Sequence, residues 1–517
     1  MRKWLVLGVV VLGLWMDLMD MTIVNVAIPA IQNDLGTSLQ GVQYVVTSYL
    51  ITIGVFEPIT AYWADTQGMK RMYLASLAIF TVASALNGLA WSLPSLIAFR
   101  ILQGIGGGMI MPLALSIVSV TFAPEERALA LGLMGLPLLA APALGPTIGG
   151  WFVQFHTWRD VFWINVPIGI VAFIAALRAL QEFPTTRKPL DLGGFVLAAI
   201  GFASLLVALS NGPTAGWGSL EIVLLLQIAI FSLALFGLWE ARHPSPLFDL
   251  RILRLRWYSS ANVVTFFTMM GLFGVLYLLP VFLETVGGLG PMDTGMTLIP
   301  LVLSAAITIP LSGLLLPRLG AVGLTSLGLT VMGLGTAQLM HLGLSWDAGW
   351  LRLWVSVIGA GLGLGIMPAI TVAYGSLPPA WMNQGSAMLN LMRQVGSALG
   401  VALYTTIIQM REPVYWTQLA STVTVTNFRA QARLAAWQQQ GIAHGLSPAQ
   451  AHVWALTMMA HQLQQTATLW AFHNAFGAAA VAAVIGIGPA LWLWGSRQVL
   501  RPPDARHTAL GEPGGVT

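Results

Sequence analysis

Five ionisable side chains interrupt the long apolar stretches of this sequence: Asp17, Asp20, Glu57, Arg100 and Arg393. A charge inside a lipid bilayer costs several kcal/mol, so each of them is a candidate functional residue. A nearby guanidinium favours the ionised form of a carboxyl group, whereas dry surroundings favour the protonated form. A carboxylate that pairs with an arginine in one conformation and leaves it in another could therefore carry a proton across a membrane.

The rise of an α-helix places these charges in depth. Asp20 lies about 24 Å from the start of its apolar run, and Arg100 lies about 9 Å from the opposite surface, so the two sit at a similar depth. Asp17 precedes Asp20 by three residues, and two carboxylates on one helical face compete for ionisation. Glu57 lies about 12 Å along the helix from Asp65, near mid-membrane, and is the deepest acid.

Each charge also has a structural interpretation. Asp20 could pin its helix through a fixed ion pair with Arg100, and Arg393 could either line a cavity or lock two helices together. Direct coupling or cation binding is an open alternative for Asp17 and Glu57.

The composition requires a membrane protein. Charged residues make up 8% of the 517 residues against about 25% in soluble proteins, apolar residues reach 56%, and the mean hydropathy is +0.78. No basic face exists for nucleic acid. There are no cysteines and no convincing His cluster, so we expect no catalytic residues, no metal and no cofactor.

Runs of about 20 apolar residues, long enough to cross the bilayer as helices, predict an all-α integral membrane protein. We count fourteen transmembrane helices, near 4–30, 41–63, 72–91, 94–121, 127–154, 160–180, 191–211, 218–240, 258–284, 294–316, 320–341, 350–374, 384–410 and 467–495.

Of the 23 Lys and Arg residues, sixteen fall on the side of the N-terminus and five on the other, and Arg100 and Arg393 lie within spans. This asymmetry predicts a multi-pass protein of the inner or plasma membrane with both termini in the cytoplasm.

Two halves of the sequence repeat each other. Gly108–Pro112 matches Leu364–Pro368 at an offset of 256 residues, and Ala143–Gly145 matches Ala398–Gly400 at an offset of 255. A chance match of Gly-rich apolar helices is the alternative, but the common offset and order favour a repeat of six helices. The predicted units are therefore an N-terminal bundle, an inserted helix pair and a C-terminal bundle, at 1–183, 184–256 and 257–517.

Six parts of the sequence carry recognisable motifs: 18–29, 61–71, 100–104, 145–150, 158–159 together with 165–169, and 393–396. Through them the chain resembles the major facilitator superfamily, and within it the fourteen-helix drug:proton antiporters of the EmrB/QacA type. Leu18–Pro29, which is similar to the first-helix signature of that group, is the most specific of them. The turn at 61–71 departs from the family pattern at Ala61, Thr66 and Met69, which weakens its charge relay.

The resemblance implies roles for further residues. The turn would form a gating loop with Asp65, Gly68, Lys70 and Arg71. The exporter motif of span five would comprise Gly145, Pro146, Gly149 and Gly150. Cavity-lining or helix-locking residues would be Asn25, Gln103, Arg393 and Gln394.

The resemblance implies a proton-coupled antiporter, not an enzyme, that exports amphipathic drugs or toxic compounds from the cytoplasm by alternating access. Its partners would be small amphipathic substrates, protons and the lipid bilayer. A dedicated exporter of one endogenous metabolite or lipid is the alternative. A proton-translocating subunit of a redox complex is a distant one, because such subunits rely on buried lysines, and Lys3, Lys70 and Lys188 all lie at the membrane edge.

The segment 411–466 is the one long outer loop of this prediction. Ser447–Gln450 has a capping-box pattern that starts a helix, and Ala430, Leu434 and Trp437 share one helical face upstream. We expect a helical hairpin on or near the outer surface. Contact with a periplasmic adaptor that leads to an outer-membrane channel is the alternative role.

Overall fold

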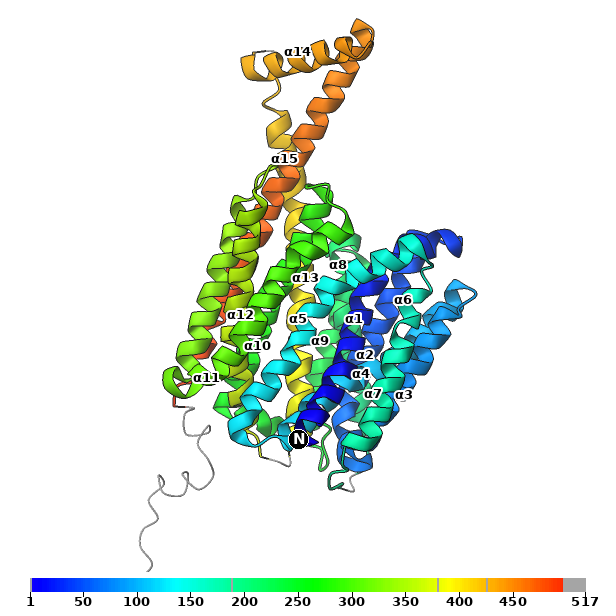
Figure 1. The fold of residues 1–517 in the computed structure, drawn as a ribbon, viewed down its shortest axis with the longest axis vertical. Helices are drawn as coiled ribbons and strands as arrows, with labels where there is room; N and C mark the ends of the chain where they lie inside the picture. Colours follow the sequence, from blue (N-terminus) through cyan, green and yellow to red (C-terminus); the bar gives the residue numbers. More distant parts are fainter. Residues whose placement is uncertain (1, 187–188, 379–380, 425, 496–517) are drawn as a thin grey trace, which may run out of the picture.

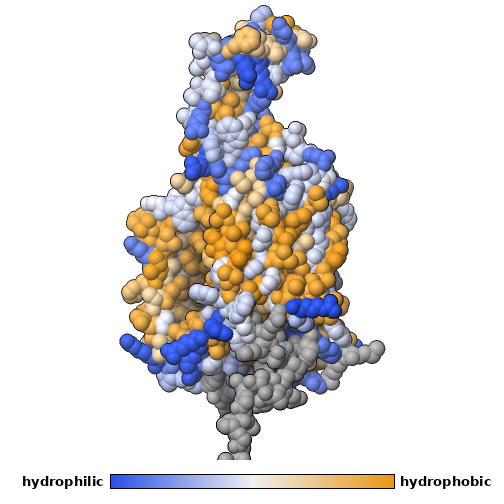
Figure 2. Space-filling model, turned by 90° about the vertical axis from the view of Figure 1, so that its left-hand side faces the viewer, coloured by the Kyte–Doolittle hydropathy of each residue, from blue (hydrophilic) through white to orange (hydrophobic). Residues whose placement is uncertain are grey.

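Long α-helices make up the structure, a computed structural model that describes residues 2–186, 189–378, 381–424 and 426–495. Lys188 and the basic residues after 495, which count toward the charge asymmetry, lie outside these ranges. No strand occurs within them, and twelve of their helices are long and apolar enough to cross a membrane. The protein is therefore a multi-pass membrane protein, in keeping with the apolar band around the bundle in Figure 2.

Helices are the expected solution for apolar runs of this length, because backbone groups in lipid must be satisfied within the segment. Polar side chains cap several of them: Ser92 forms a capping box with Ser95, and Asp347 accepts from the backbone of Trp350. The helices are α1 Arg2–Asp34, α2 Leu39–Gln67, α3 Met69–Gly88, α4 Leu93–Thr121, α5 Pro124–Phe155, α6 Asp160–Trp163, α7 Asn165–Ala179, α8 Leu192–Ala215, α9 Leu220–Glu240, η1 Leu250–Arg254, α10 Arg256–Thr285, α11 Pro291–Gln338, η2 Leu339–His341, α12 Ala348–Ser376, α13 Met382–Ala420, α14 Phe428–Ala443, α15 Pro448–Ile485 and α16 Ile487–Leu491.

The helix α11 contains 48 residues, about 72 Å at 1.5 Å per residue, which is more than twice the thickness of the hydrocarbon core. A kink divides it at Gly320, whose φ of 75° is non-helical. The segment after the kink packs closely against α12, where Gly328 lies beside Gly361 and Gly365. The chain therefore reverses at Gly320, near the boundary that the sequence predicts between two spans.

The predicted outer loop at 411–466 is mostly helical. The helix α13 continues to Ala420 and α15 begins at Pro448, with the expected capping box of Ser447 and Gln450. Between them lies the short helix α14, which pairs with α15 where Gly441 approaches Ala451. The predicted helical hairpin exists, but α13 and α15 carry it away from the bundle instead of laying it on the surface (Figure 1).

The two halves of the bundle meet mainly at one end. We call this end, which carries the N-terminus, the N-terminal side, and the opposite end the α14 side (Figure 1). Near the N-terminal side, Gly132 and Gly135 of α5 face Ile309 and Met367 of the C-terminal half. Farther along, α5 packs on α1 instead. The inserted helices α8 and α9 cover the seam through an apolar cluster with α2 and α13.

Close packing of α11 on α12 provides a test of the fold. A Cβ on Gly328 would lie 2.2 Å from the backbone nitrogen of Gly365, so Gly328→Ala should lower the melting temperature through a backbone clash of about 1–3 kcal/mol. Gly323→Ala is the matched control, because its Cβ would meet nothing nearer than 3.9 Å. Thermal unfolding of both variants in detergent measures the difference; equal melting temperatures would contradict this packing.

Candidate functional site

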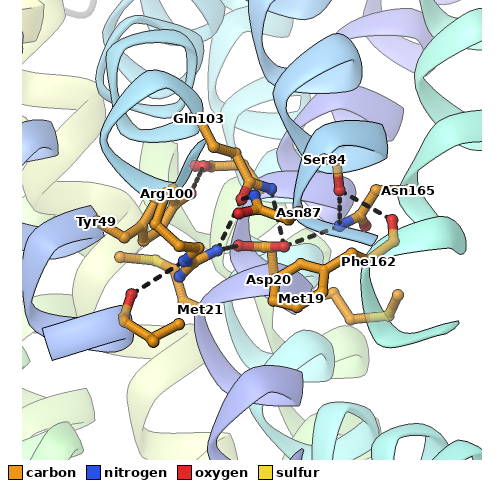
Figure 3. A network of polar contacts seen from close by, with 12 residues as sticks. Met19, Asp20, Met21, Tyr49, Ser84, Asn87, Arg100, Gln103, Phe162 and Asn165 are labelled. Carbon is orange, nitrogen blue, oxygen red and sulfur yellow. Dashed lines mark hydrogen bonds and ion pairs between the residues drawn. The ribbon is translucent and has the colours of Figure 1, made fainter. Parts of the chain in front are cut away.

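Asp20 lies at the centre of a buried polar network between α1, α4 and α7 (Figure 3). Arg100 donates a hydrogen bond and an ion pair to Oδ2 of Asp20. Oδ1 accepts from Gln103 Nε2 at 2.9 Å and from Asn165 Nδ2 at 2.8 Å. The carboxylate is 0% exposed, and each of its two oxygens accepts from at least one donor, so the network satisfies this buried polar group within the bundle.

Several other groups hold Arg100 in place. Its Nε donates to the carbonyl of Val45 at 3.1 Å, and Nη1 also donates to Oε1 of Gln103 at 2.8 Å. The guanidinium lies 4.0 Å from the centroid of the Tyr49 ring, a cation–π distance. A guanidinium suits this position because its planar fork can serve several acceptors at once.

Asp17 has different surroundings from Asp20, although the two were expected to share a face. Tyr49 donates its hydroxyl to Oδ1 of Asp17 at 2.7 Å, and Gly107 leaves the space for this contact. Asp17 lines a cavity between the halves, whereas Asp20 is enclosed on all sides. Tyr49 therefore connects the two carboxylates, because its hydroxyl binds Asp17 and its ring stacks on Arg100, which is paired with Asp20.

The cavity has a volume of about 100 Å³ and lies between α1, α2, α4, α10 and α13. Its polar lining beside Asp17 consists of Asn390, Arg393, Gln394 and Ser397. A second, smaller cavity of about 30 Å³ adjoins it through Arg393 and is lined by methionines, which adapt to differently shaped apolar groups: Met111, Met134, Met269 and Met367. Arg393 and Gln394 thus line the cavities.

The face of α1 that lines the cavity continues toward the α14 side. Asp17, Met21 and Asn25 follow one another at four-residue spacing and so share a face. Asp17 and Met21 line the cavity, while Asn25 is exposed. This face of α1 therefore runs from the buried Asp17 to the exposed Asn25.

Glu57 of α2 is 0% exposed and faces the C-terminal half. Asn390 of α13 donates to its Oε1, while Oε2 has no hydrogen-bond partner among the described residues. The structure thus brings Glu57 to the seam between the halves and not to the Asp20 network.

The turn after α2 connects both halves at the N-terminal side. Asn383 of α13 donates to Oδ1 of Asp65 at 2.5 Å. Glu182 caps the start of α3, because its two oxygens accept from the backbone nitrogens of Lys70 and Arg71 at 3.1 and 3.2 Å. Gly68 has a φ of 100° and permits this approach, since a Cβ there would lie 2.4 Å from the carboxylate of Glu182.

The glycines of span five let α5 approach α1. A Cβ on Gly145 would lie 2.2 Å from Oγ1 of Thr22, and one on Gly149 would lie 2.9 Å from the side chain of Ile23. Gly150 faces open space, and the side chain of Pro146 lies outside the described part of the structure.

Sequence reasoning missed the polar partners of the charged residues. Tyr49 and Asn390 carry no signal in a single sequence, because neutral polar residues occur at many positions of the spans. Asn165 stands within a segment that resembles the exporters, so its signal was present. Glu182 lies just beyond the end of a predicted span and next to the predicted gating loop in space, which only the fold reveals.

The family model of the Major Facilitator Superfamily matches residues 10–401. The chain belongs to this superfamily, and it is a transporter and not an enzyme. It is 30% identical to the multidrug export protein EmrB of Escherichia coli strain K12, over 87% of this chain and 88% of that protein. It is 32% identical to the tetracenomycin C resistance and export protein of Streptomyces glaucescens, over 79% and 77% of the two chains.

A solved structure confirms the fold. The human organic anion transporter MFSD10 (TETRAN) matches with a TM-score of 0.56 at 14% identity, over 93% of this chain and 99% of that chain. The sequence-based assignment to the superfamily, with relatives that are drug exporters, is therefore confirmed.

The fork of Arg100 provides a test of the site. Arg100→Lys keeps the positive charge, but one ammonium group cannot serve Val45, Asp20 and Gln103 together. We expect a loss of about 1–3 kcal/mol and a lower melting temperature, because at least one buried acceptor loses its donor. Arg429→Lys on the exposed face of α14 is the control. Equal melting temperatures for the two variants would refute the idea that the Arg100 guanidinium must serve all three acceptors.

Proposed function

We propose that this protein is a proton-coupled antiporter that exports amphipathic compounds from the cytoplasm by alternating access. The observation that carries the proposal is the buried pairing of Asp20 with Arg100 from another helix, next to Asp17 at the cavity. A carboxylate paired in this way can take up a proton only when the pair separates, and this requirement links proton binding to a change of conformation. The names of the relatives, which include a multidrug export protein, support export of foreign compounds.

The residues have distinct proposed roles. Asp17 receives the proton first, because it faces the cavity, and Asp20 exchanges it when Arg100 moves away. Arg393 and Gln394 contact the substrate from the C-terminal half, and the methionines of the adjoining cavity accept its apolar part. Asp65 and Asn383 close the N-terminal side in this conformation, with Gly68, Lys70 and Arg71 holding the turn in shape.

A dedicated exporter of a single compound is the second candidate. The relative from Streptomyces glaucescens is named for resistance to one compound, tetracenomycin C. A panel of lipophilic cations and neutral amphiphiles, tested in proteoliposomes under an imposed pH gradient, distinguishes the two: one accepted compound supports the dedicated exporter and several support the multidrug exporter.

We assign fourteen spans to the chain. The twelve apolar helices become fourteen when α5, which has 32 residues, is added and α11 is divided at Gly320. The proposed units are 1–183, the inserted pair at 184–256 and 257–517. The basic residues on the N-terminal side then lie in the cytoplasm, and α14 lies outside, where an adaptor would reach it.

Reporter fusions test this topology. A fusion after Arg256 and one at the C-terminus should report the cytoplasm, and one in the turn before α14 should report the outside, because sixteen basic residues favour the first side and five the second. One inverted reporter in this set would overturn the count of fourteen.

Asp20→Asn tests the proton site. The substitution removes the titratable group and preserves the shape, so gradient-driven transport should fall to background while exchange without a gradient survives. A purely structural pair would instead leave Arg100 buried and unpaired, at a cost of about 3–5 kcal/mol and with a lower melting temperature. Transport and melting temperature are measured on the same preparation.

Asp17→Asn and Glu57→Gln are assayed beside it, because either could be the main carrier. Full coupled transport by Asp20→Asn would show that Asp20 is not the carrier and would transfer the role to the variant that loses coupling. Asp160→Asn, at the half-buried start of α6 and outside the Asp20 network, is the matched control and should transport as the parent does.

A further inference from the structure

Glu57 of α2 and Arg393 of α13 are buried side chains of opposite charge on the two sides of the seam between the halves, and each acts electrostatically on the other. Asn390 of α13 donates to Oε1 of Glu57, and Arg393 follows Asn390 by three residues, so both side chains lie on the same face of α13. Oε2 of Glu57 and Nε of Arg393 have no hydrogen-bond partner among the described residues. Both side chains are buried, at 0% and 9% exposure.

This pair is part of an ordered antiparallel contact between α2 and α13. Asp65 meets Asn383 at the N-terminal side, Ala61 and Ala387 share an apolar cluster one turn further, and Glu57 meets Asn390 one turn beyond that. The contact ends at the cavity, which Asn390 and Arg393 also line. Glu57 is therefore the innermost polar contact of the seam, at the floor of the space that Asp17 faces.

We propose that Glu57 is a proton-dependent latch that holds the N-terminal side closed. In its ionised form the carboxylate attracts Arg393 and accepts from Asn390, and so holds α2 against α13. Protonation removes the attraction to Arg393 and leaves a buried guanidinium without a counter-charge, which favours separation of the two helices. The inference rests on the proposed function, and it adds a second protonation site in a different part of the molecule from Asp20.

The charges around Glu57 favour this behaviour. Arg393 of α13 and Asp17 of α1 are the charged groups that act on it. The helix α8, which also packs against α2, contains no acidic or basic residue. Two further helices pack against α2, and their basic side chains lie beside other acids. Arg100 of α4 pairs with Asp20, and Lys70 and Arg71 lie beside Glu182 in the first turn of α3. The protonation state of Glu57 thus decides whether Arg393 has a counter-charge in the seam.

The direction of the effect fits an antiporter. In this conformation the face of α1 that lines the cavity runs from Asp17 to the exposed Asn25 on the α14 side, from which protons would enter, and Asp65 and Asn383 close the seam at the N-terminal side. Protonation of Glu57 would release the seam after the proton has entered, so that the cavity opens to the opposite side. Loss of the proton to that side would allow the seam to close again.

The absence of cysteine from the sequence makes a direct test possible. Ala123→Cys, before α5, and Leu319→Cys, beside the kink of α11, place spin labels at exposed positions of the two halves on the N-terminal side. Electron–electron distance measurements in lipid nanodiscs should show a longer distance as the pH falls. Glu57→Gln should give the long distance at every pH, because the neutral amide keeps the shape of the glutamate but cannot attract Arg393.

Three variants control the experiment. Glu284→Gln changes an exposed glutamate in α10 and should leave the pH dependence as in the parent. Asp65→Asn removes a charge from the same seam nearer the surface and should retain a pH dependence through Glu57. Arg393→Gln removes the attraction from the other half and should abolish the pH dependence even if Glu57→Gln does not fold.

The outcomes separate the latch from the proposed function. A parent pH dependence that persists in both Glu57→Gln and Arg393→Gln overturns the latch, and so does a parent distance that does not change with pH. If Glu57→Gln and Arg393→Gln lose the pH dependence of the distance but the parent protein shows no gradient-driven transport, the latch is supported and proton-coupled export is overturned. If the parent protein shows gradient-driven transport and the spin-label distance still depends on pH in both Glu57→Gln and Arg393→Gln, the export function is supported and the latch is overturned.

Discussion

The structure depends on the requirement that every charge inside the apolar bundle has a compensating partner. Asp20 meets it completely, with a guanidinium, a glutamine amide and an asparagine amide arranged around its two oxygens. These donors come from α4 and α7, so the network also fixes the relative position of three helices of the N-terminal half. Glycines allow neighbouring helices to approach α1 closely: Gly107 of α4 faces Asp17 and Tyr49, and Gly145 of α5 faces Thr22.

Two other buried acids, Asp17 and Glu57, are less completely compensated. Asp17 has one hydroxyl donor and faces the cavity, and Glu57 has one amide donor and an oxygen without a partner in the described part of the chain. A fully compensated carboxylate stabilises one arrangement, whereas a partly compensated one makes the arrangement sensitive to a proton or a ligand. The molecule thus has a fully satisfied network within one half and less complete polar contacts between the halves, where the proposed alternating access would require movement.

The sequence predicts the depth of a side chain in the membrane, because depth follows from its position along the helix. It does not predict which neighbouring helix the side chain faces, because that depends on the rotation of the helix about its axis. The rise per residue was enough to place Asp20 and Arg100 at one depth, and they are in contact. Depth does not tell which neighbour a side chain faces, so Tyr49, Asn390 and Glu182 could not be found. The capping box at Ser447 was readable because it is local, whereas the direction of α13 and α15 beyond the bundle follows from their packing on each other.

The continuous helix α13 relates two distant parts of the molecule mechanically. It begins beside Asp65 at the seam and ends at Ala420 near α14, a length of 39 residues or about 58 Å. A helix of this length converts a tilt of about 10° at its base into a displacement of about 10 Å at its tip. The α14 hairpin stands at the far end of the helix that contacts Asp65, so under the proposed alternating access its displacement would report which side of the transporter is open.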